Sequence, residues 1–219
     1  MEIIPTILSK TSEEAEQKIR VVEKQSEWIQ IDAMDGIFVN NETFPYNGNY
    51  KENISKLKTL KIRSNIEAHL MVNKPEEIIN DWLEIADRIF IHFESRITNR
   101  ELGINTIIEK AHKQKKQIGL AINPETDVAA TMPFLKNLDA VLCMTVQPGW
   151  GGQEFKPWVL KKIKYLKKIW PNGITAVDGG VNNKNIKRIK KAGTDIAYIG
   201  THIFNSKNPE KRLKKLKRK

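Results

Sequence analysis

The chain alternates between short apolar runs rich in β-branched residues and longer charged stretches with helical periodicity. The apolar runs have the length and composition of strands buried on both faces, which occur in parallel sheets whose strands are separated by helices. Eight runs predict strands, over residues 3–8, 28–32, 65–71, 88–93, 117–122, 140–146, 174–178 and 196–199. Eight charged stretches predict helices, over residues 12–24, 50–60, 75–85, 104–115, 127–135, 156–169, 183–192 and 209–216.

Eight strand–helix units within 219 residues predict a compact (β/α)₈ TIM barrel. A doubly wound open sheet is the alternative that the same pattern allows. No linker or break in composition divides the chain, so we expect a single TIM-barrel domain over residues 1–219. Its last element is expected to be a basic helix within residues 207–219.

Composition indicates the cellular compartment in which such a chain would function. Hydrophobic residues make up 40% of the sequence, enough for a full core, and no apolar stretch is long enough to cross a bilayer. The first residues lack the basic and apolar regions of a signal peptide, and Cys143 is the only cysteine, so an internal disulfide is impossible. We therefore expect a cytoplasmic protein with no membrane partner.

Two predicted strands end at an aspartate that a glycine soon follows, Asp32 and Asp178. In a barrel the carboxyl ends of the strands form the active face, where burial and neighbouring groups tune the pKa of an acid. His69 lies near the end of a third strand. These three side chains could bind one divalent metal ion, and their donor set suits Zn, Fe, Mn or Co. Alternatively, His69 is a core histidine and the aspartates cap helices.

Glycines gather after the last three predicted strands. In residues 147–153, three glycines surround Trp150, a composition typical of a mobile lid with an apolar cover. Glycines also follow the seventh and eighth strands, at Gly179, Gly180 and Gly200, where barrels commonly bind phosphate through backbone N–H groups. The alternative is that each glycine serves an ordinary tight turn.

Five segments together resemble the ribulose-phosphate 3-epimerases, in order and with that family's spacing over nearly the whole chain. They are IPTILS at 4–9, IDAMDGIFV at 31–39, AHLM at 68–71, QPGWGGQ at 147–153 and VDGGV at 177–181. The resemblance implies a pentose-phosphate enzyme that inverts C3 of D-ribulose 5-phosphate to give D-xylulose 5-phosphate. It also implies one divalent metal ion and a homo-oligomer.

The resemblance further implies a role for each matching residue. Asp32 and Asp178 would be acid and base on opposite faces of the substrate and would also bind the metal, with His69 as a third ligand. The methionines would form an apolar collar around the reacting carbon, although their pattern alone indicates core packing. Backbone glycines would hold the phosphate, and Thr6 replaces a family serine but keeps the hydroxyl. The expected substrate contacts are Thr6, Met34, His69, Met71, Met144, Gly149, Trp150, Gly151, Gly152, Gly179, Gly180, Gly200 and Thr201.

One position departs from the family. Two residues before Asp32 the family normally has histidine, and this chain has Gln30. A neutral amide oxygen is a poor replacement for imidazole on zinc, and it favours harder ions such as Mn or Mg. Either three strong ligands hold the ion with Gln30 or water as the fourth, or the metal differs, or the site is degraded. We favour the first two, because the aspartates, His69, the methionines and the lid remain together.

Other activities stay open at this point. A 3-epimerase of a six-carbon ketose phosphate, such as D-allulose 6-phosphate, would share these motifs, and Trp150 and residues 40–46 could alter the space for the chain. A catalytically weakened homologue that binds sugar phosphate or nucleic acid is also possible. Barrels that decarboxylate or condense sugar phosphates commonly use Asp-x-Lys-x-x-Asp, and residues 32–35 contain no lysine.

Two further features of the chain have alternative interpretations. The formal charge of +11 and the basic tail at 207–219 could indicate nucleic-acid binding. The tail, however, lacks interleaved aromatic residues, and Leu213 and Leu216 are typical of a barrel helix with a solvated face, so nucleic acid is not expected as a partner. His92 fits either a partner of the metal site or core packing.

Overall fold

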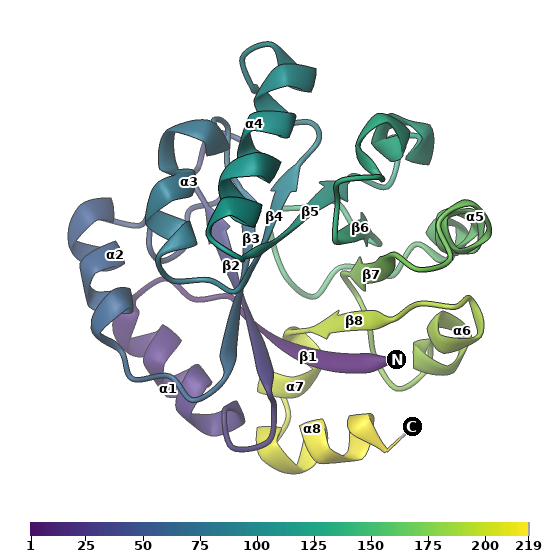
Figure 1. The fold of residues 1–219 in the computed structure, drawn as a ribbon. Helices are drawn as coiled ribbons and strands as arrows, with labels where there is room; N and C mark the ends of the chain where they lie inside the picture. Colours follow the sequence, from purple (N-terminus) through teal and green to yellow (C-terminus); the bar gives the residue numbers. More distant parts are fainter. Residues whose placement is uncertain (219) are drawn as a thin grey trace.

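The computed structural model describes residues 1–218 and shows a closed barrel of eight parallel strands in chain order (Figure 1). Pairing of β1 with β8 closes the sheet, so the TIM-barrel prediction is confirmed and the open sheet is wrong. Each strand end is within two residues of its predicted position. The strands are β1 (Glu2–Ile7), β2 (Trp28–Met34), β3 (Asn65–Met71), β4 (Arg88–His92), β5 (Gln117–Ile122), β6 (Ala140–Met144), β7 (Ile174–Asp178) and β8 (Ile196–Ile199).

Helices surround the barrel, one or more after each strand (Figure 1). Several begin at capping residues: the side chains of Thr11 and Asn208 accept hydrogen bonds from backbone N–H groups in the first turns of their helices. The helices are α1 (Ser12–Val22), α2 (Tyr50–Thr59), α3 (Pro75–Leu83), α4 (Arg100–Lys113), η1 (Val128–Phe134), η2 (Pro157–Val159), α5 (Leu160–Ile169), α6 (Ile186–Lys191), α7 (Thr201–Phe204) and α8 (Pro209–Lys217), of which η1 and η2 are 3₁₀ helices.

The helices differ from the prediction in several places. The α4 helix begins four residues before its predicted start at 104, and α6 begins three residues after its predicted start at 183. The stretch expected as an α-helix over 127–135 is the 3₁₀ helix η1, because Pro133 lies inside it and removes a backbone donor. The helix expected from residue 156 begins as η2 and becomes α-helical only at Leu160. The four-residue α7 is too short to leave a periodic pattern in the sequence. The predicted basic tail is α8, and Lys219 lies outside the described residues.

Two apolar layers stabilise the barrel. The larger layer packs the outer faces of the strands against the helices, with Ile31 and Leu213 among its buried side chains. The smaller fills the barrel interior with side chains such as Phe90, Leu142 and Tyr198. Because inward-facing residues recur at every second position, the interior is built in layers along the strands.

One interior layer is ionic. Glu67 and Arg88 are neighbours on β3 and β4, and the Arg88 Nη1 to Glu67 Oε2 distance is 2.7 Å. Arg88 also lies over the ring of Trp28, with its Cζ 4.5 Å from the ring centroid. Burial raises the pKa of Glu67 to about 7 even though Arg88 opposes the shift. Glu67 lies two residues before His69 on β3, so the Glu67–Arg88 pair lies in the interior layer directly below the strand-end residues.

Among the described residues no helix has both the length and the apolar character needed to cross a membrane. The buried apolar stretches are instead short strands and single faces of amphipathic helices, as the sequence pattern predicts.

Candidate active site

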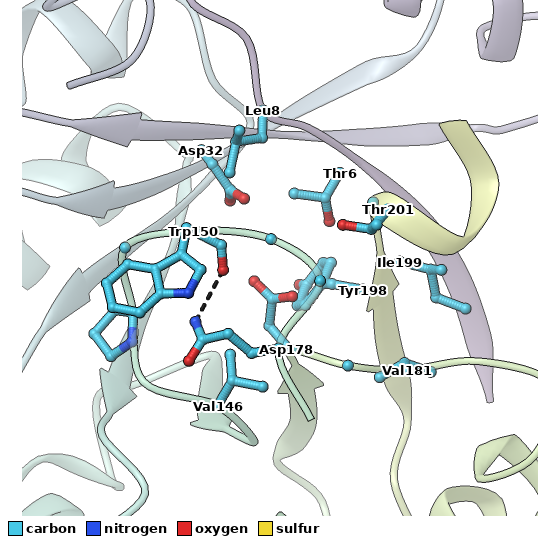
Figure 2. Close-up of a pocket in the computed structure, with 18 of the residues that line it drawn as sticks. Thr6, Leu8, Asp32, Val146, Trp150, Asp178, Val181, Tyr198, Ile199 and Thr201 are labelled. Atoms are coloured by element: carbon cyan, nitrogen blue, oxygen red, sulfur yellow. Dashed lines mark hydrogen bonds between the residues drawn. The ribbon is translucent and has the colours of Figure 1, made fainter. Parts of the chain in front are cut away.

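Asp32, His69 and Asp178 converge at the carboxyl end of the barrel. Register pairs Asp32 of β2 with His69 of β3, while Asp178 ends β7. One potential ligand atom from each residue lies within 4.8 Å of the other two. The His69 Nδ1 is 3.3 Å from Asp32 Oδ1 and 3.4 Å from Asp178 Oδ2. Figure 2 shows the two carboxylates pointing toward each other from opposite sides of a cavity. The predicted convergence is therefore present.

Gln30 lies beneath these carboxylates and is completely buried. Its Nε2 donates to Asp32 Oδ1 at 3.1 Å and to Asp178 Oδ2 at 3.3 Å, so one amide bridges the two acids. The same nitrogen is 3.5 Å from the hydroxyl of Thr6, its neighbour in register on β1. Within residues 1–218 the Gln30 Oε1 has no hydrogen-bond partner, which leaves a buried acceptor unsatisfied.

A chain of hydrogen bonds extends behind His69. His69 Nε2 and His92 Nε2 are 2.9 Å apart, and His92 Nδ1 is 3.3 Å from Glu94 Oε2. Glu94 in turn accepts hydrogen bonds from the Asn123 N–H and the Thr126 hydroxyl. Both histidines are completely buried. The sequence allowed two interpretations of His92, a partner of the metal site or a core residue. In the structure His92 contacts His69 of the strand-end cluster, and its ring is also buried in the core.

The charges along this chain fix which nitrogen carries each proton. Burial opposes ionisation of Glu94, but its hydrogen bonds with His92, Thr126 and the Asn123 N–H outweigh that effect and hold its pKa below the usual range. Burial lowers the pKa of His92 to about 4, so this ring is neutral. His92 Nδ1–H then donates to Glu94, and its Nε2 accepts from His69 Nε2–H. The other ring nitrogen of His69, Nδ1, faces the two aspartates.

The pKa values of Asp32 and His69 are both raised, which favours the neutral form of the aspartate and the charged form of the histidine. Burial, with a further contribution from nearby Asp178, raises the pKa of Asp32 to about 6. Burial alone would lower the pKa of His69, but its interactions with Asp178 and Asp32 outweigh burial and raise it to about 9. At neutral pH the metal-free cluster therefore carries a protonated His69 between the two acids. Such perturbed groups in a cavity are typical of functional sites.

The cavity above this cluster has a volume of about 320 Å³. Most sequence-predicted substrate contacts line it, and His69 is the exception because it lies behind the carboxylates. The predicted lining residues are Thr6, Asp32, Met34, Met71, Met144, Gly149, Trp150, Gly151, Gly152, Asp178, Gly179, Gly180, Gly200 and Thr201. The three methionines stand beside the strand-end aspartates, since Met34 pairs with Met71 and Met144 pairs with Asp178 in register.

The wall also contains residues that sequence reasoning missed. Val146, Asn182 and Lys18 line the cavity, and only Lys18 among the lining residues is a lysine or arginine. Val146 lies just beyond β6, and Asn182 follows the Asp-Gly-Gly turn, so their positions after strands were an available signal. Lys18 lies in the middle of α1, where nothing in the sequence distinguishes it from a surface lysine.

The Asp-Gly-Gly turn after β7 requires its glycines. Gly179 has φ +112°, and a Cβ there would lie 2.3 Å from Val146 Cγ2. Gly180 has φ +64°, and its Cβ would lie 2.8 Å from the backbone oxygen of Gln153. L side chains rarely adopt such φ values, and neither space admits a methyl group. The turn is thus fitted against the loop at 147–156, which explains why the two motifs occur together.

The loop at 147–156 covers one side of the cavity, with Trp150 at its rim and 58% exposed (Figure 2). Gln153 Nε2 donates to the backbone oxygens of Gln147 at 2.6 Å and Trp150 at 2.9 Å, which closes the loop on itself. Asn41 Nδ2 donates to the Gly149 oxygen at 2.6 Å and so connects this loop to residues 35–49 after β2.

Comparison with known proteins identifies the family to which the chain belongs. The model of the Ribulose-phosphate 3 epimerase family matches residues 2–204. The chain belongs to this family. The ribulose-phosphate 3-epimerase of Schizosaccharomyces pombe is 33% identical over 210 residues, which cover 95% of this chain and 89% of the relative. That of Eremothecium gossypii is 31% identical over 191 residues, covering 84% and 78%.

A solved structure shows how widely the fold is shared. The 3-hexulose-6-phosphate synthase of Salmonella typhimurium superimposes on this family member with a TM-score of 0.72 at 16% identity. The match covers 100% of this chain and 97% of that protein. At this identity the likeness concerns the barrel alone.

Members of this epimerase family use a divalent metal, and the strand-end cluster fits one. Two carboxylates and the His69 Nδ1 offer three donors from separate strands, and His92 and Glu94 orient the imidazole as partners of metal-bound histidines commonly do. The Oε1 of Gln30, unpaired within residues 1–218, would become a fourth donor if the amide turned end for end, since Nε2 now contacts both acids. The donor set of two carboxylates, one imidazole and one amide suits Mn, Fe, Co or Zn.

Proposed function

We propose that this protein interconverts D-ribulose 5-phosphate and D-xylulose 5-phosphate by moving the proton at C3. The observation that carries the proposal is the opposed pair of carboxylates, Asp32 and Asp178, in a 320 Å³ cavity. Inversion at a carbon requires one group to remove a proton from one face and another to return a proton to the opposite face. Two acids on strands from opposite sides of the barrel provide that arrangement.

The two aspartates divide the work by their protonation states. Removal of the C3 proton by one ionised carboxylate gives an enediolate, and the second aspartate must hold a proton for the other face. With its pKa raised to about 6, Asp32 can carry that proton near neutral pH, and the return reaction reverses the roles. Each well-placed proton-transfer group typically contributes about 10²- to 10⁴-fold in rate. A bound divalent ion would stabilise the negative charge that develops on the substrate oxygens.

The remaining cavity residues orient the substrate. The backbone around Gly180, Gly200 and Thr201 would bind the phosphate through N–H groups, and Thr6 would contact the sugar through its hydroxyl. The methionines surround the reacting carbon with an apolar, adaptable wall that excludes water. The loop at 147–156 would cover the bound substrate, with Trp150 as the apolar part of the cover.

Gln30 decides which ion the site prefers. If its amide turned end for end, the unpaired Oε1 would face the cluster in place of Nε2, and a buried acceptor would gain a partner. A neutral amide oxygen favours harder ions than the histidine usual in the family does. We therefore infer that manganese, rather than zinc, gives the more active enzyme.

The test follows the C3 proton of D-ribulose 5-phosphate by NMR in D₂O, with metal-stripped protein and then with added Mn, Zn, Fe or Co. We expect metal-dependent exchange together with formation of D-xylulose 5-phosphate. Asp32→Asn and Asp178→Asn should each lower turnover by at least about 10²-fold. Asp127→Asn is the matched control, because asparagine caps η1 as aspartate does and the site is untouched.

The outcomes separate the alternatives. Unchanged turnover in both aspartate variants would refute the two-acid mechanism. No exchange of the five-carbon substrate with any ion, together with exchange of D-allulose 6-phosphate, would assign the site to a six-carbon ketose phosphate. No exchange of either substrate would mean that the site binds sugar phosphate without turning it over.

A further inference from the structure

Positive charge is concentrated in the last third of this chain. Residues 156–219 contain 19 of the 37 lysines and arginines but only 3 of the 26 aspartates and glutamates. Their formal charge is therefore +16, and that of residues 1–155 is −5. Such asymmetry between segments of one chain is typical of proteins that bind a polyanion.

The fold gathers this charge on one side of the barrel. The helices α5, α6 and α8 follow one another around the outside, next to β7, β8 and β1 (Figure 1). The strands that separate them in sequence are buried and nearly uncharged. Most basic side chains of α5, α6 and α8 therefore lie on the outside of the barrel wall.

A groove of about 500 Å³ crosses this surface between α5 and α6. One wall comes from η2 and α5 and the other from α6. Apolar groups and four cations line it together: Pro157, Trp158, Leu160, Lys161, Lys164, Arg188, Lys191 and Ala192.

The four cations of the groove, Lys161, Lys164, Arg188 and Lys191, are exposed. In the described part of the chain, none of them forms an ion pair, although elsewhere on the surface lysines such as Lys58 pair with carboxylates. Unpaired cations around a concave surface create a local positive potential that attracts negative groups.

Trp158, the aromatic residue of the groove, indicates which class of anionic ligand the groove would bind. Trp158 is 44% exposed and lines the groove, so one part of the indole is open for stacking. Tyr165, two turns further along α5, is also 44% exposed. Aromatic rings interleaved with cations form the usual surface for single-stranded nucleic acid, whose bases stack while its phosphates meet the charges.

We propose that the groove between α5 and α6 binds single-stranded nucleic acid, with a base stacked on Trp158 and phosphates held by Lys161, Lys164, Arg188 and Lys191. The tail at 207–218 lacks aromatic residues of its own, and in the fold α8 follows α6 around the outside of the barrel (Figure 1). A free nucleotide would need only the groove, whereas a strand would also use the charge that continues over α8. A lipid surface fits less well, because Trp158 is part of the lining of a groove.

The test measures binding of the full chain to a fluorescent 12-nucleotide oligouridylate by anisotropy, over a series of salt concentrations. Four phosphate contacts to a single strand predict a slope of about −3 for log K against log salt. The groove variant Lys161→Gln/Arg188→Gln should lower the size of that slope by about 1.4. The matched control, Lys61→Gln/Lys113→Gln, removes the same charge from the other side of the barrel and should change the slope far less.

A second pair of variants tests stacking. Trp158→Ala should weaken binding about tenfold or more, and Trp158→Phe, which keeps a flat ring, should recover most of the loss. Circular dichroism confirms that each variant folds. Equal losses in the groove and control pairs would overturn the proposal, since they would indicate a diffuse field. Binding of phosphatidylserine vesicles or free UMP without binding of the oligonucleotide would also overturn it, as would no binding at 150 mM salt, roughly the physiological range.

Discussion

The contact between His69 and His92 should set how tightly the site holds a divalent ion. His69 is completely buried, and the 2.9 Å contact with His92 is the hydrogen bond of its Nε2. His92→Phe preserves a ring of similar size against Phe38, whose centroid is 4.8 Å from that of His92, but it removes the acceptor. In the variant the Nε2–H of His69 is buried without a partner.

An unpaired buried N–H costs about 1 to 3 kcal/mol. The metal-bound form needs a proton on Nε2 and a free Nδ1, so it bears the whole cost. The metal-free ring, protonated on both nitrogens below pH 9, bears less of it, because it can release the Nε2 proton and keep the one on Nδ1 beside the acids. Converted at 1.4 kcal/mol per factor of ten, the affinity for the ion should fall by about 5- to 150-fold. Losses of this size are common when a partner of a metal-bound histidine is removed.

The assay is a Mn²⁺ titration followed by electron paramagnetic resonance of the free ion at pH 8. Glu94→Gln is the graded variant: it keeps an oxygen acceptor for His92 but loses the charge, so it should lose less affinity than His92→Phe. His112→Gln, on the surface of α4, is the control and should bind the ion as the unmodified chain does. A His92→Phe protein that is folded and binds Mn²⁺ within twofold of the unmodified chain would refute the reasoning.

Three further results are expected. Because an ion must displace the proton that His69 holds with a pKa of about 9, the affinity for Mn²⁺ should rise about tenfold per pH unit up to pH 9 and then level off. Below pH 6 the proton on Asp32 adds a second unit of slope, and a flat titration profile between pH 6 and 8 would contradict this linkage. Gln30→His should shift the ratio of Zn²⁺ to Mn²⁺ affinity toward zinc by about tenfold or more in competition dialysis, and an unchanged ratio would show that residue 30 is not a ligand. Arg88→Met should lower the free energy of unfolding in urea by about 3 to 5 kcal/mol, because it leaves Glu67 buried without its cation. Adding Glu67→Gln should recover part of the loss. If the Arg88→Met protein were as stable as the unmodified chain, the Glu67–Arg88 pair would not stabilise the barrel.

Much of this architecture could be predicted because the signals are local. A buried strand needs an apolar run, and a strand-end carboxylate beside glycine is visible at Asp32 and Asp178 without any tertiary information. The glycine spacing also indicates the loop at 147–156 and the turns after β7 and β8, all of which line the cavity. The one helix misjudged in type, η1, contains Pro133 and is only seven residues long, so local sterics outweighed its periodicity.

What the sequence could not provide are contacts that depend on how strands pair. His92 reaches His69 only because β3 and β4 are neighbours with a particular register, and Glu94 is held by the turn after β5. Gln30 is recognisable as a departure from its family, but its bridge between two acids depends on where β7 stands relative to β2. The groove at Trp158 likewise requires α5 and α6 to pack side by side.

Asn41 ties together two loops that the barrel would otherwise support independently. Its Nδ2 bonds to Gly149 in the loop over the cavity, and its Oδ1 accepts from Lys10 Nζ at 2.6 Å, so a residue outside the cavity wall connects three strand-end segments. If the loop at 147–156 has to open to release product, it must first break the hydrogen bond from Asn41. Where that opening limits turnover, changes of sequence in the β2–α2 connection would alter the rate of the whole cycle while leaving the proton transfers untouched.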